Sequence, residues 1–365
     1  MDIIKSTKKY EKWLSQSIEI VQPDLELKHK NMTDSPFSFL RATFYRWVQL
    51  FNKKCEKLID AYKVLSVGDL HIENFGTWRD IEGRLIWGIN DFDEAYTIPY
   101  TNDLVRLATS THMAINEGHL KIEKTDACDS ILKGYKEGLE VGGKPFVLSE
   151  DKHNWLRETA TFRLKNPVDF WNKLEGNIEI KKAPDELVKM ILKNMPGYSD
   201  NYKVVQRIAG LGSLGRKRYV IITDWAGGKI AREAKSYAPS ACIFAYKSVD
   251  EELNYDTIVN SSIRCKDPFL LIKKNWIIRR LAPDCSRIEL TSLPKEHDEK
   301  KLLYSMGWET ANVHLGSKNS AKNILNDIAK RDKNWLHDNS SLMLEAVEED
   351  QKEWKKEFEK EDKSR

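Results

Sequence analysis

The 365-residue sequence has little net charge, no paired cysteine motif and no long apolar run. Its 59 basic and 56 acidic side chains nearly cancel to a formal charge of +3, which leaves no strong field to attract a polyanion and argues against nucleic acid as the main partner. The five scattered cysteines indicate neither a disulfide framework nor a zinc knuckle. No segment approaches the roughly 18 apolar residues that cross a bilayer, and the N-terminus has no signal-like apolar run. We therefore expect a reduced, cytoplasmic protein with no membrane partner.

Glycine does not occur before Gly68, which excludes a glycine-rich phosphate loop from the first part of the chain. That part is predicted to be helical, with a turn at TDSPF (33–37) before an amphipathic helix at 38–59. Two short apolar stretches at 62–67 and 84–90 predict strands, because a polar, turn-rich loop separates them.

In the rest of the chain, the predicted secondary structure changes from helices to strands and back to helices. Helical periodicity returns from 102 to about 158 and again at 184–195. Five short strands are then predicted from the segments KVVQRIA, RKRYVIIT, GKIAREA, PFLLIKK and NWIIRRL. After Pro294 the pattern is helical again, and the charged C-terminus predicts a solvated helix or a frayed tail.

These patterns predict an α+β fold with two lobes. With 41% apolar and 32% charged residues, the composition is that of a folded, enzyme-sized protein. A large helical lobe is expected at 1–199 and a small antiparallel, strand-rich lobe at 200–290. The helices at 291–365 are expected to complete the large lobe.

The clearest chemical motif is VGDLHIENFG (67–76), followed by NDFDEA (90–95). Phosphoryl transfer needs a carboxylate near the attacking hydroxyl, oxygen ligands for Mg²⁺, and donors to the phosphates. Asp69 is predicted to accept the hydroxyl proton, and Asn74 to offer a carbonyl oxygen to the metal. Asp91 lies after a short strand, where a hairpin returns it beside Asn74 and completes a site for a hard cation.

Each of these residues also has a plain structural interpretation. Aspartate and asparagine often line turns because their side chains bond the local backbone, so an isolated D-x-x-x-x-N is usually a turn. The combination with Asp91 and Asp103 favours the catalytic interpretation. A loop histidine such as His71 is usually structural, and Asp93 is either a second metal ligand or a solvated neighbour.

The series G-D-x-H-x-x-N, followed further on by D-F-D, resembles the catalytic and metal loops of aminoglycoside and choline kinases. Asp103, in NDLVRLATS, resembles the structural aspartate that follows the metal loop in that superfamily. Val67 departs from the pattern, because those enzymes commonly have a histidine there. SPFSFLRATFYRW, VGDLHIENFGTW, NDFDEA, GLGSLGRKRY and GWETANVHLGS together resemble a bacterial family catalogued as domain of unknown function 2252. The resemblance implies a protein-kinase-like fold without an assigned substrate.

Gly210, Gly212 and Gly215 form G-L-G-S-L-G, a motif that dinucleotide-binding folds and kinases share. A dinucleotide site needs a helix directly after the glycines, whereas RKRYVIIT predicts a strand. Strand, loop and strand is the kinase arrangement, in which the glycine backbone covers the triphosphate and Ser213 adds a hydroxyl donor. An ordinary glycine-rich hairpin is the structural alternative.

The segment GKIAREAKSY (228–237) offers a cation for the α and β phosphates of ATP. The family resemblance puts a lysine before E-A, where this chain has Arg232. Strand alternation places Arg232 and Lys235 on opposite faces, so only one of them points at the nucleotide, and Lys235 is the preferred candidate. Glu251 and Glu252 are candidates for its helical partner, with a solvated surface as the alternative.

In ordinary kinases the glycine loop precedes the catalytic loop, and this chain has the reverse order. Circular permutation is the simplest explanation, because cutting an exposed connection and joining the old ends preserves the contacts that form the site. On this hypothesis the helix around His314 packs beneath the catalytic loop.

The sequence thus predicts an ATP- and Mg²⁺-dependent phosphotransferase that acts on a hydroxyl of a small molecule. Adenylyl transfer from the same site is an alternative, since kinase folds host more than one chemistry. A pseudokinase that binds nucleotide without transfer is another, although the intact Asp69, Asn74 and Asp91 argue against it.

Overall fold

The computed structural model describes residues 2–161, 167–180, 183–197, 201–248, 252–285 and 298–363. The helices are α1 (Ile3–Ser17), α2 (Gln22–Asn31), α3 (Pro36–Ala42), α4 (Phe44–Lys54), α5 (Tyr100–Asn116), α6 (Lys124–Glu140), α7 (Asn154–Thr161), α8 (Pro167–Glu175), α9 (Asp185–Lys193), α10 (Ala241–Tyr246), α11 (Tyr255–Ser261), α12 (Glu299–His314), α13 (Ser320–Ile328) and α14 (Trp335–Lys363). Short 3₁₀ turns cover Glu56–Leu58, Asp151–His153 and Leu211–Ser213. The strands are β1 (Lys63–Ser66), β2 (Phe75–Arg79), β3 (Leu85–Ile89), β4 (Tyr96–Pro99), β5 (Phe146–Val147), β6 (Tyr202–Gln206), β7 (Arg218–Trp225), β8 (Gly228–Ser236), β9 (Leu271–Lys273) and β10 (Trp276–Leu281).

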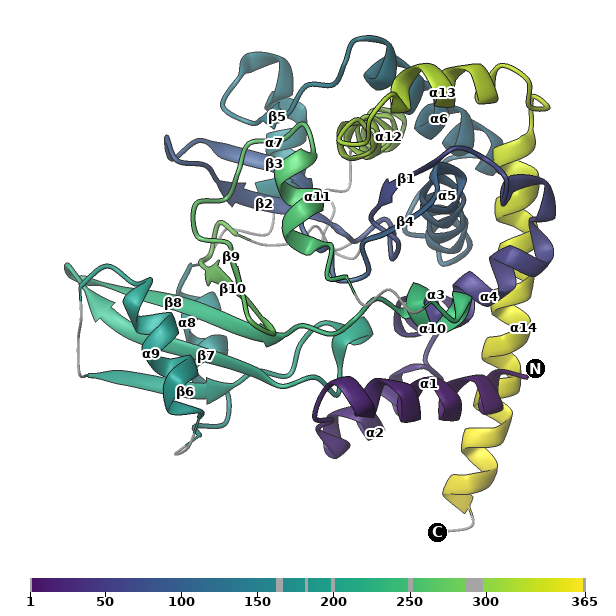
Figure 1. Cartoon of the computed structure of the whole chain (residues 1–365). Helices are drawn as coiled ribbons and strands as arrows, with labels where there is room; N and C mark the ends of the chain where they lie inside the picture. The colour runs from purple at the N-terminus through teal and green to yellow at the C-terminus, as the bar shows by residue number, and fades with distance from the viewer. Residues whose placement is uncertain are drawn as a thin grey trace.

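The described residues form a mixed α+β structure, as predicted. Figure 1 shows a helical body on one side and a part formed by β6 to β10 with α8 and α9 on the other. No helix among the described residues combines the length and apolar character that crossing a membrane requires.

Helices from both ends of the chain build the helical body. Helix α5 is buried from Tyr100 to Ala114 and forms its centre. Helix α12 crosses α6 at two glycines: a Cβ added to Gly307 would lie 2.0 Å from the carbonyl oxygen of Ile131, and one added to Gly134 would lie 1.9 Å from that of Tyr304. Only glycine permits this approach, so α12 packs directly on the N-terminal half of the chain.

The strands of the helical body form two small antiparallel sheets. β1 pairs with β4, and β2, β3 and β5 form the second sheet in that order. β1 and β3 confirm the strands predicted at 62–67 and 84–90. The segment between them is not only a loop, because Phe75–Arg79 forms β2 and pairs with β3. The β2–β3 hairpin therefore brings the end of β3 beside the start of β2, where Phe75 pairs with Ile89.

The five strands predicted in the second part of the chain are present and form one antiparallel sheet, in the order β6-β7-β8-β10-β9. An apolar cluster lies on each of its faces. Leu187 and Ile191 of α9 pack on the face that carries Ile221 and Ala234. Leu174 of α8 packs on the opposite face.

One helical prediction needs correction, and the structure decides between the two alternatives for the C-terminus. The helix expected at 38–59 is divided, because Thr43 leaves helical geometry (φ −127°, ψ 43°) between α3 and α4. For the charged C-terminus, the helix alternative is confirmed over its described residues and the frayed tail is not: α14 extends to Lys363, although Trp354 is buried in the core rather than solvated. Asp350 of α14 also pairs with Arg46 of α4, with an Nε–Oδ2 distance of 2.6 Å. Apolar positions at helical spacing outweigh the charge density there.

Candidate functional site

A cavity of about 890 Å³ lies between the helical body and the five-stranded sheet. Its wall includes Asp69, Asn74 and Asp91 from the first part of the chain and Gly210 and Gly212 from the second. Two segments that are far apart in sequence therefore meet across one cavity.

The turn that carries Asp69 is fixed by buried groups behind it. The Asp103 carboxylate accepts hydrogen bonds from the backbone N–H groups of Val67 (2.7 Å) and Gly68 (2.9 Å). His314 Nε2 lies 3.1 Å from the same carboxylate, so α12 supports this loop as the sequence predicts. Gly68 has φ +81°, and a Cβ there would lie 2.4 Å from the Glu94 carbonyl oxygen. Glycine is required because the backbone is left-handed and close to a neighbour.

Asp69 makes an ion pair that the sequence analysis missed. Arg106 of α5 donates to Asp69 Oδ1, and Asp69 Oδ2 has no hydrogen-bond donor among the described residues. The guanidinium also donates to the Leu40 carbonyl oxygen (2.9 Å) and lies over the rings of Phe44 and Trp47. Burial raises the pKa of Asp69 to about 6, although Arg106 opposes the shift.

The β2–β3 hairpin brings Asn74 and Asp91 together, as predicted. Asn74 Nδ2 donates to the carbonyl oxygens of Asp69 (3.3 Å) and Asp91 (3.2 Å). The amide nitrogen of Asn74 is thus used within the loop, while its Oδ1 is left for another partner. Burial alone would raise the pKa of Asp91, but Lys235 and then Arg279 hold it below its ordinary value.

Asp93 and Glu94 are buried rather than solvated, which corrects one interpretation of Asp93. Asp93 Oδ2 lies 2.6 Å from Lys235 Nζ and 3.3 Å from Arg216 Nη1. Arg216 Nη2 also contacts Glu94 Oε1 at 3.2 Å. Asp93 Oδ1 is buried and has no hydrogen-bond partner among the described residues.

His71 has a structural place in this loop. Its Nδ1 accepts from the backbone N–H of Glu73 at 3.2 Å, and its ring packs edge-on against Phe37. Glu73 in turn pairs with Arg41, with an Nη1–Oε2 distance of 2.8 Å. These contacts make the loop rigid beside Asp69.

The glycine loop approaches the loop that carries Asp69 at Gly212. A Cβ on Gly212 would lie 2.9 Å from the Arg41 carbonyl oxygen and 3.5 Å from Asp69 Oδ2, so even one methyl group would be crowded. The Gly212 carbonyl oxygen accepts from Lys28 Nζ at 3.1 Å. Ser213 lines the cavity as well.

Of the other two glycines of the motif, Gly210 lines the cavity and Gly215 lies outside it. Gly210 lines the cavity with φ +76°. Gly215 does not line it; its carbonyl oxygen accepts from the Val21 N–H at 2.8 Å, and it packs beside Leu25 of α2. Gly215 therefore joins the loop to the N-terminal helices.

Arg232 and Lys235 point to opposite faces of β8, as strand alternation predicts. Lys235 Nζ lies between Asp91 Oδ1 (3.3 Å) and Asp93 Oδ2 (2.6 Å). Neither Arg232 nor Lys235 lines the cavity, and the Arg232 guanidinium stacks over the Phe269 ring at 4.7 Å. Lys235 thus contacts the acidic loop and Arg232 does not.

No helical glutamate holds Lys235 among the described residues. Glu251 lies outside them, and Glu252 is exposed and precedes α11 rather than belonging to a helix. The carboxylates that hold Lys235 come from the loop after β3.

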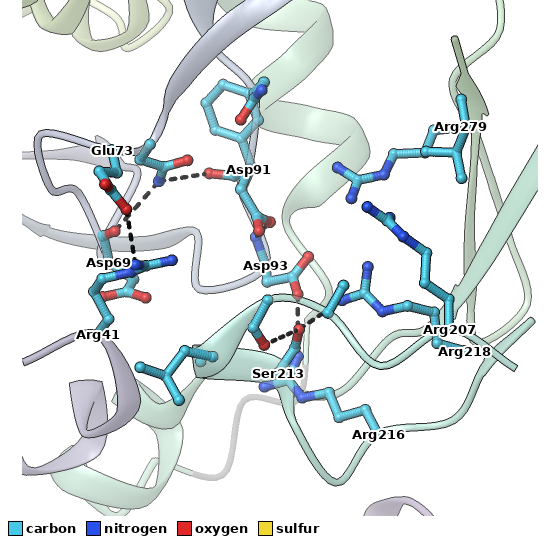
Figure 2. A pocket seen from close by; sticks show the side chains of 18 of the residues that line it. Arg41, Asp69, Glu73, Asp91, Asp93, Arg207, Ser213, Arg216, Arg218 and Arg279 are labelled. Atoms are coloured by element: carbon cyan, nitrogen blue, oxygen red, sulfur yellow. Dashed lines mark hydrogen bonds and ion pairs between the residues drawn. The ribbon is translucent and has the colours of Figure 1, made fainter. Parts of the chain in front are cut away.

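A cluster of three arginines around one glutamate is the main feature that the sequence analysis missed. Glu233 is fully buried and accepts from Arg207 Nη1 (2.6 Å), Arg218 Nη1 (2.9 Å) and Arg279 Nε (2.8 Å). All three arginines line the cavity, and Figure 2 shows Arg207, Arg218 and Arg279 on the side opposite Asp91. The only sequence signal is charged residues inside predicted strands, where β-branched and apolar residues are more usual.

The model of a family described as "uncharacterized protein conserved in bacteria (DUF2252)" matches residues 21–166, which is less than half of the chain. The matched segment contains Asp69, Asn74, Asp91 and Asp103. The glycine loop and the GWETANVHLGS helix lie outside it, so the match is narrower than the resemblance drawn from the motifs. Comparison with curated proteins and with solved structures gave no match.

Proposed function

We propose that this chain is a kinase-like phosphotransferase that moves the γ-phosphoryl group of Mg²⁺-ATP to a hydroxyl of a small-molecule acceptor. The observation that carries the proposal is the approach of the Gly212 backbone to the Asp69 carboxylate within one cavity. A phosphate-covering loop and a catalytic carboxylate must meet in this way for phosphoryl transfer. The cavity volume of about 890 Å³ suits a ligand of nucleotide size.

In this proposal Asp69 is the general base. Arg106 occupies Oδ1 and fixes the carboxylate, which leaves Oδ2 toward the glycine loop to accept the acceptor's hydroxyl proton. The hydroxyl oxygen forms a bond to the γ-phosphorus, the bond to the β-phosphate oxygen breaks, and ADP leaves with that electron pair. Carboxylate and leaving group thus act on opposite sides of the transferred group.

Mg²⁺ fits the residues present. Asn74 Oδ1 and Asp91 would hold it, and the unpartnered Asp93 Oδ1 is a further buried oxygen beside them. No group of three His, Cys, Asp or Glu side chains suited to a metal occurs among the described residues, but nucleotide-bound Mg²⁺ usually takes only one or two carboxylates besides phosphate and water. The ion would neutralise charge that develops on the phosphate oxygens.

We further propose that the fold is a circularly permuted kinase-like fold. The glycine hairpin of β6 and β7 and the acidic β2–β3 hairpin face one cavity, although their order in the chain is reversed. The packing of α12 on α6 and of His314 on Asp103 supports the assignment of the C-terminal helices to the same body as the catalytic loop. A permutation preserves such contacts while it moves the chain ends.

The test is the position of the label that ATP transfers. Purified protein with Mg²⁺ and a panel of hydroxylated metabolites should transfer label from [γ-³²P]ATP and not from [α-³²P]ATP. Transfer of the α label would replace the proposal by adenylyl transfer. Saturable ATP binding without transfer of either label to any acceptor would indicate a nucleotide-binding pseudokinase.

The base assignment has its own test. Asp69→Asn should abolish transfer and leave ATP affinity nearly unchanged, because the amide keeps the shape and loses the basicity. Asp224→Asn is the matched control, since Asp224 is an exposed residue of β7 outside the cavity. Full turnover in Asp69→Asn would remove the base assignment.

A further inference from the structure

The walls of the cavity carry an excess of positive charge at one place. Around Glu233, three guanidinium groups share one carboxylate, which leaves two positive charges uncompensated within the cluster. Asp91 acts on Arg279 from across the cavity, but it already lies 3.3 Å from Lys235. Positive charge held in a partly buried wall favours an anionic ligand, because burial of unpaired charge is costly.

The arginines also have donors to spare. A guanidinium has five N–H groups in a planar fork. Arg207 uses Nη1 and Arg279 uses Nε for Glu233, and no other side-chain hydrogen bond to a described residue occupies either group. Their side chains are 29% and 27% exposed, so the remaining donors are open to the cavity. This planar fork matches the oxygens of a phosphate group better than the single ammonium of a lysine does.

The position of the cluster is that of a phosphate site. Arg207 and Arg218 stand at the two ends of the glycine loop, where the Arg207 N–H donates to the Arg218 carbonyl oxygen at 3.4 Å. Arg218 Nη2 also donates to Ser213 Oγ at 2.7 Å, which ties the loop to the cluster. Arg279 comes from β10, opposite Glu233 in the sheet register. Anything beneath the glycine loop therefore lies beside all three arginines.

We propose that Arg207, Arg218 and Arg279 bind the polyphosphate of the nucleotide, with Glu233 as the positioning residue that holds them. Lys235, the cation expected in this role, instead pairs with Asp91, one of the two proposed metal ligands, and with Asp93. This inference rests on the proposed function, because it names the phosphate ligands of the same site. Unlike the proposed phosphotransferase activity, this inference can be tested by measuring the binding of phosphate compounds without any reaction.

The experiment measures binding of inorganic tripolyphosphate, ATP and adenosine by calorimetry without Mg²⁺, so that the acidic residues contribute no metal-mediated affinity. The variants are Arg207→Gln and Arg279→Gln, and the control is Arg157→Gln, which removes the same charge from an exposed position of α7. Each substitution in the cluster should weaken tripolyphosphate and ATP by about tenfold or more, the usual effect of losing a charge-assisted hydrogen bond. The control should bind like the wild type, and adenosine affinity should not change.

Arg279→Lys refines the test, because it keeps the charge and loses the fork. It should bind tripolyphosphate more weakly than the wild type. If the glutamine variants do not fold, wild-type protein is treated with phenylglyoxal instead, and modified peptides are identified by mass. Tripolyphosphate should protect Arg207 and Arg279 but not Arg157.

The possible failures are distinguishable. Wild-type affinity in Arg207→Gln and Arg279→Gln, or no saturable tripolyphosphate binding, overturns the arginine assignment, and γ-label transfer then still supports the phosphotransferase. Arginine-dependent tripolyphosphate binding without transfer of label supports the phosphate site and removes the phosphotransferase. Unprotected Arg207 and Arg279 in the chemical experiment also overturn the assignment.

Discussion

Replacing Arg106 by methionine tests whether its buried ion pair with Asp69 holds the loop that carries Asp69 in place. Arg106 is fully buried, and its guanidinium reaches Asp69 and the Leu40 carbonyl oxygen between two aromatic rings. Methionine keeps the apolar contact with the rings and removes the charge. The Asp69 carboxylate is then left beside apolar groups without its counter-ion.

The expected loss is large. Removing one partner of a buried pair typically costs about 3–5 kcal/mol, because the remaining charge is uncompensated. For a chain of this size, one kcal/mol corresponds to roughly 2 °C in melting temperature, so Arg106→Met should lower it by roughly 6–10 °C. In an Asp69→Asn background the same substitution should cost at least about 1 kcal/mol less, since no carboxylate remains to be stranded.

Urea unfolding of the wild type, both single variants and the double variant measures this coupling. The matched control is Arg46→Met, because Arg46 makes a comparable pair with Asp350 away from the cavity. Its effect and that of Asp69→Asn should add within about 0.5 kcal/mol. An equal cost of Arg106→Met with and without the Asp69 carboxylate would refute the reasoning.

Three further predictions concern close packing and buried charge. Gly212→Ala places a methyl group 2.9 Å from the Arg41 carbonyl oxygen of α3, so the glycine loop should shift. The value of kcat/KM should fall by about five- to a hundredfold with little change in melting temperature. Unchanged turnover would contradict this. Gly307→Ala forces α12 and α6 apart and should destabilise the fold by about 1–3 kcal/mol in thermal melts, whereas Gly228→Ala, with open space around it, should not; equal melts would contradict this. Burial raises the pKa of Glu309 to about 7, although Arg264 opposes the shift. The folded protein therefore binds the Glu309 proton more tightly than the unfolded chain does. This contribution to the free energy of unfolding is fully present below about pH 4.5 and is lost as the pH rises through 7. Relative to Glu309→Gln, the wild type should lose up to roughly 3 kcal/mol of unfolding free energy between pH 5 and pH 8 in urea titrations, and parallel pH profiles would contradict this.

Local patterns were sufficient to predict the five strands of the large sheet and the proximity of Asn74 to Asp91. The five strands of the sheet were found because β-branched residues alternate between turn signals. Asn74 and Asp91 were placed together correctly, since a hairpin fixes its register over few residues. Strand β2 was missed because Gly76 and its polar surroundings read as loop, while pairing with β3 overrides that preference.

The sequence could not reveal contacts that depend on tertiary burial. Arg106 follows a helical pattern in which a charged residue normally faces water, and only the packing of α3 and α4 over α5 encloses it. The charged end of α14 was predicted to be a solvated helix or a frayed tail because its charge density hides the apolar spacing of residues such as Trp354. In both cases a neighbour distant in sequence decides burial.

The arginine cluster shows why the net charge of the chain says little about the charge inside this cavity. The formal charge of +3 is a sum over the whole chain, and it argues only against a broad field for a long polyanion. At the acidic loop, Lys235 and Arg216 both pair with Asp93, so the charge of that loop is locally neutralised. The excess around Glu233 is therefore confined to one wall, where low surrounding dielectric strengthens it and salt screens it less than at the surface. A small, highly charged group such as a triphosphate can enter the cavity and contact these positive charges, whereas a nucleic acid is too large to reach them.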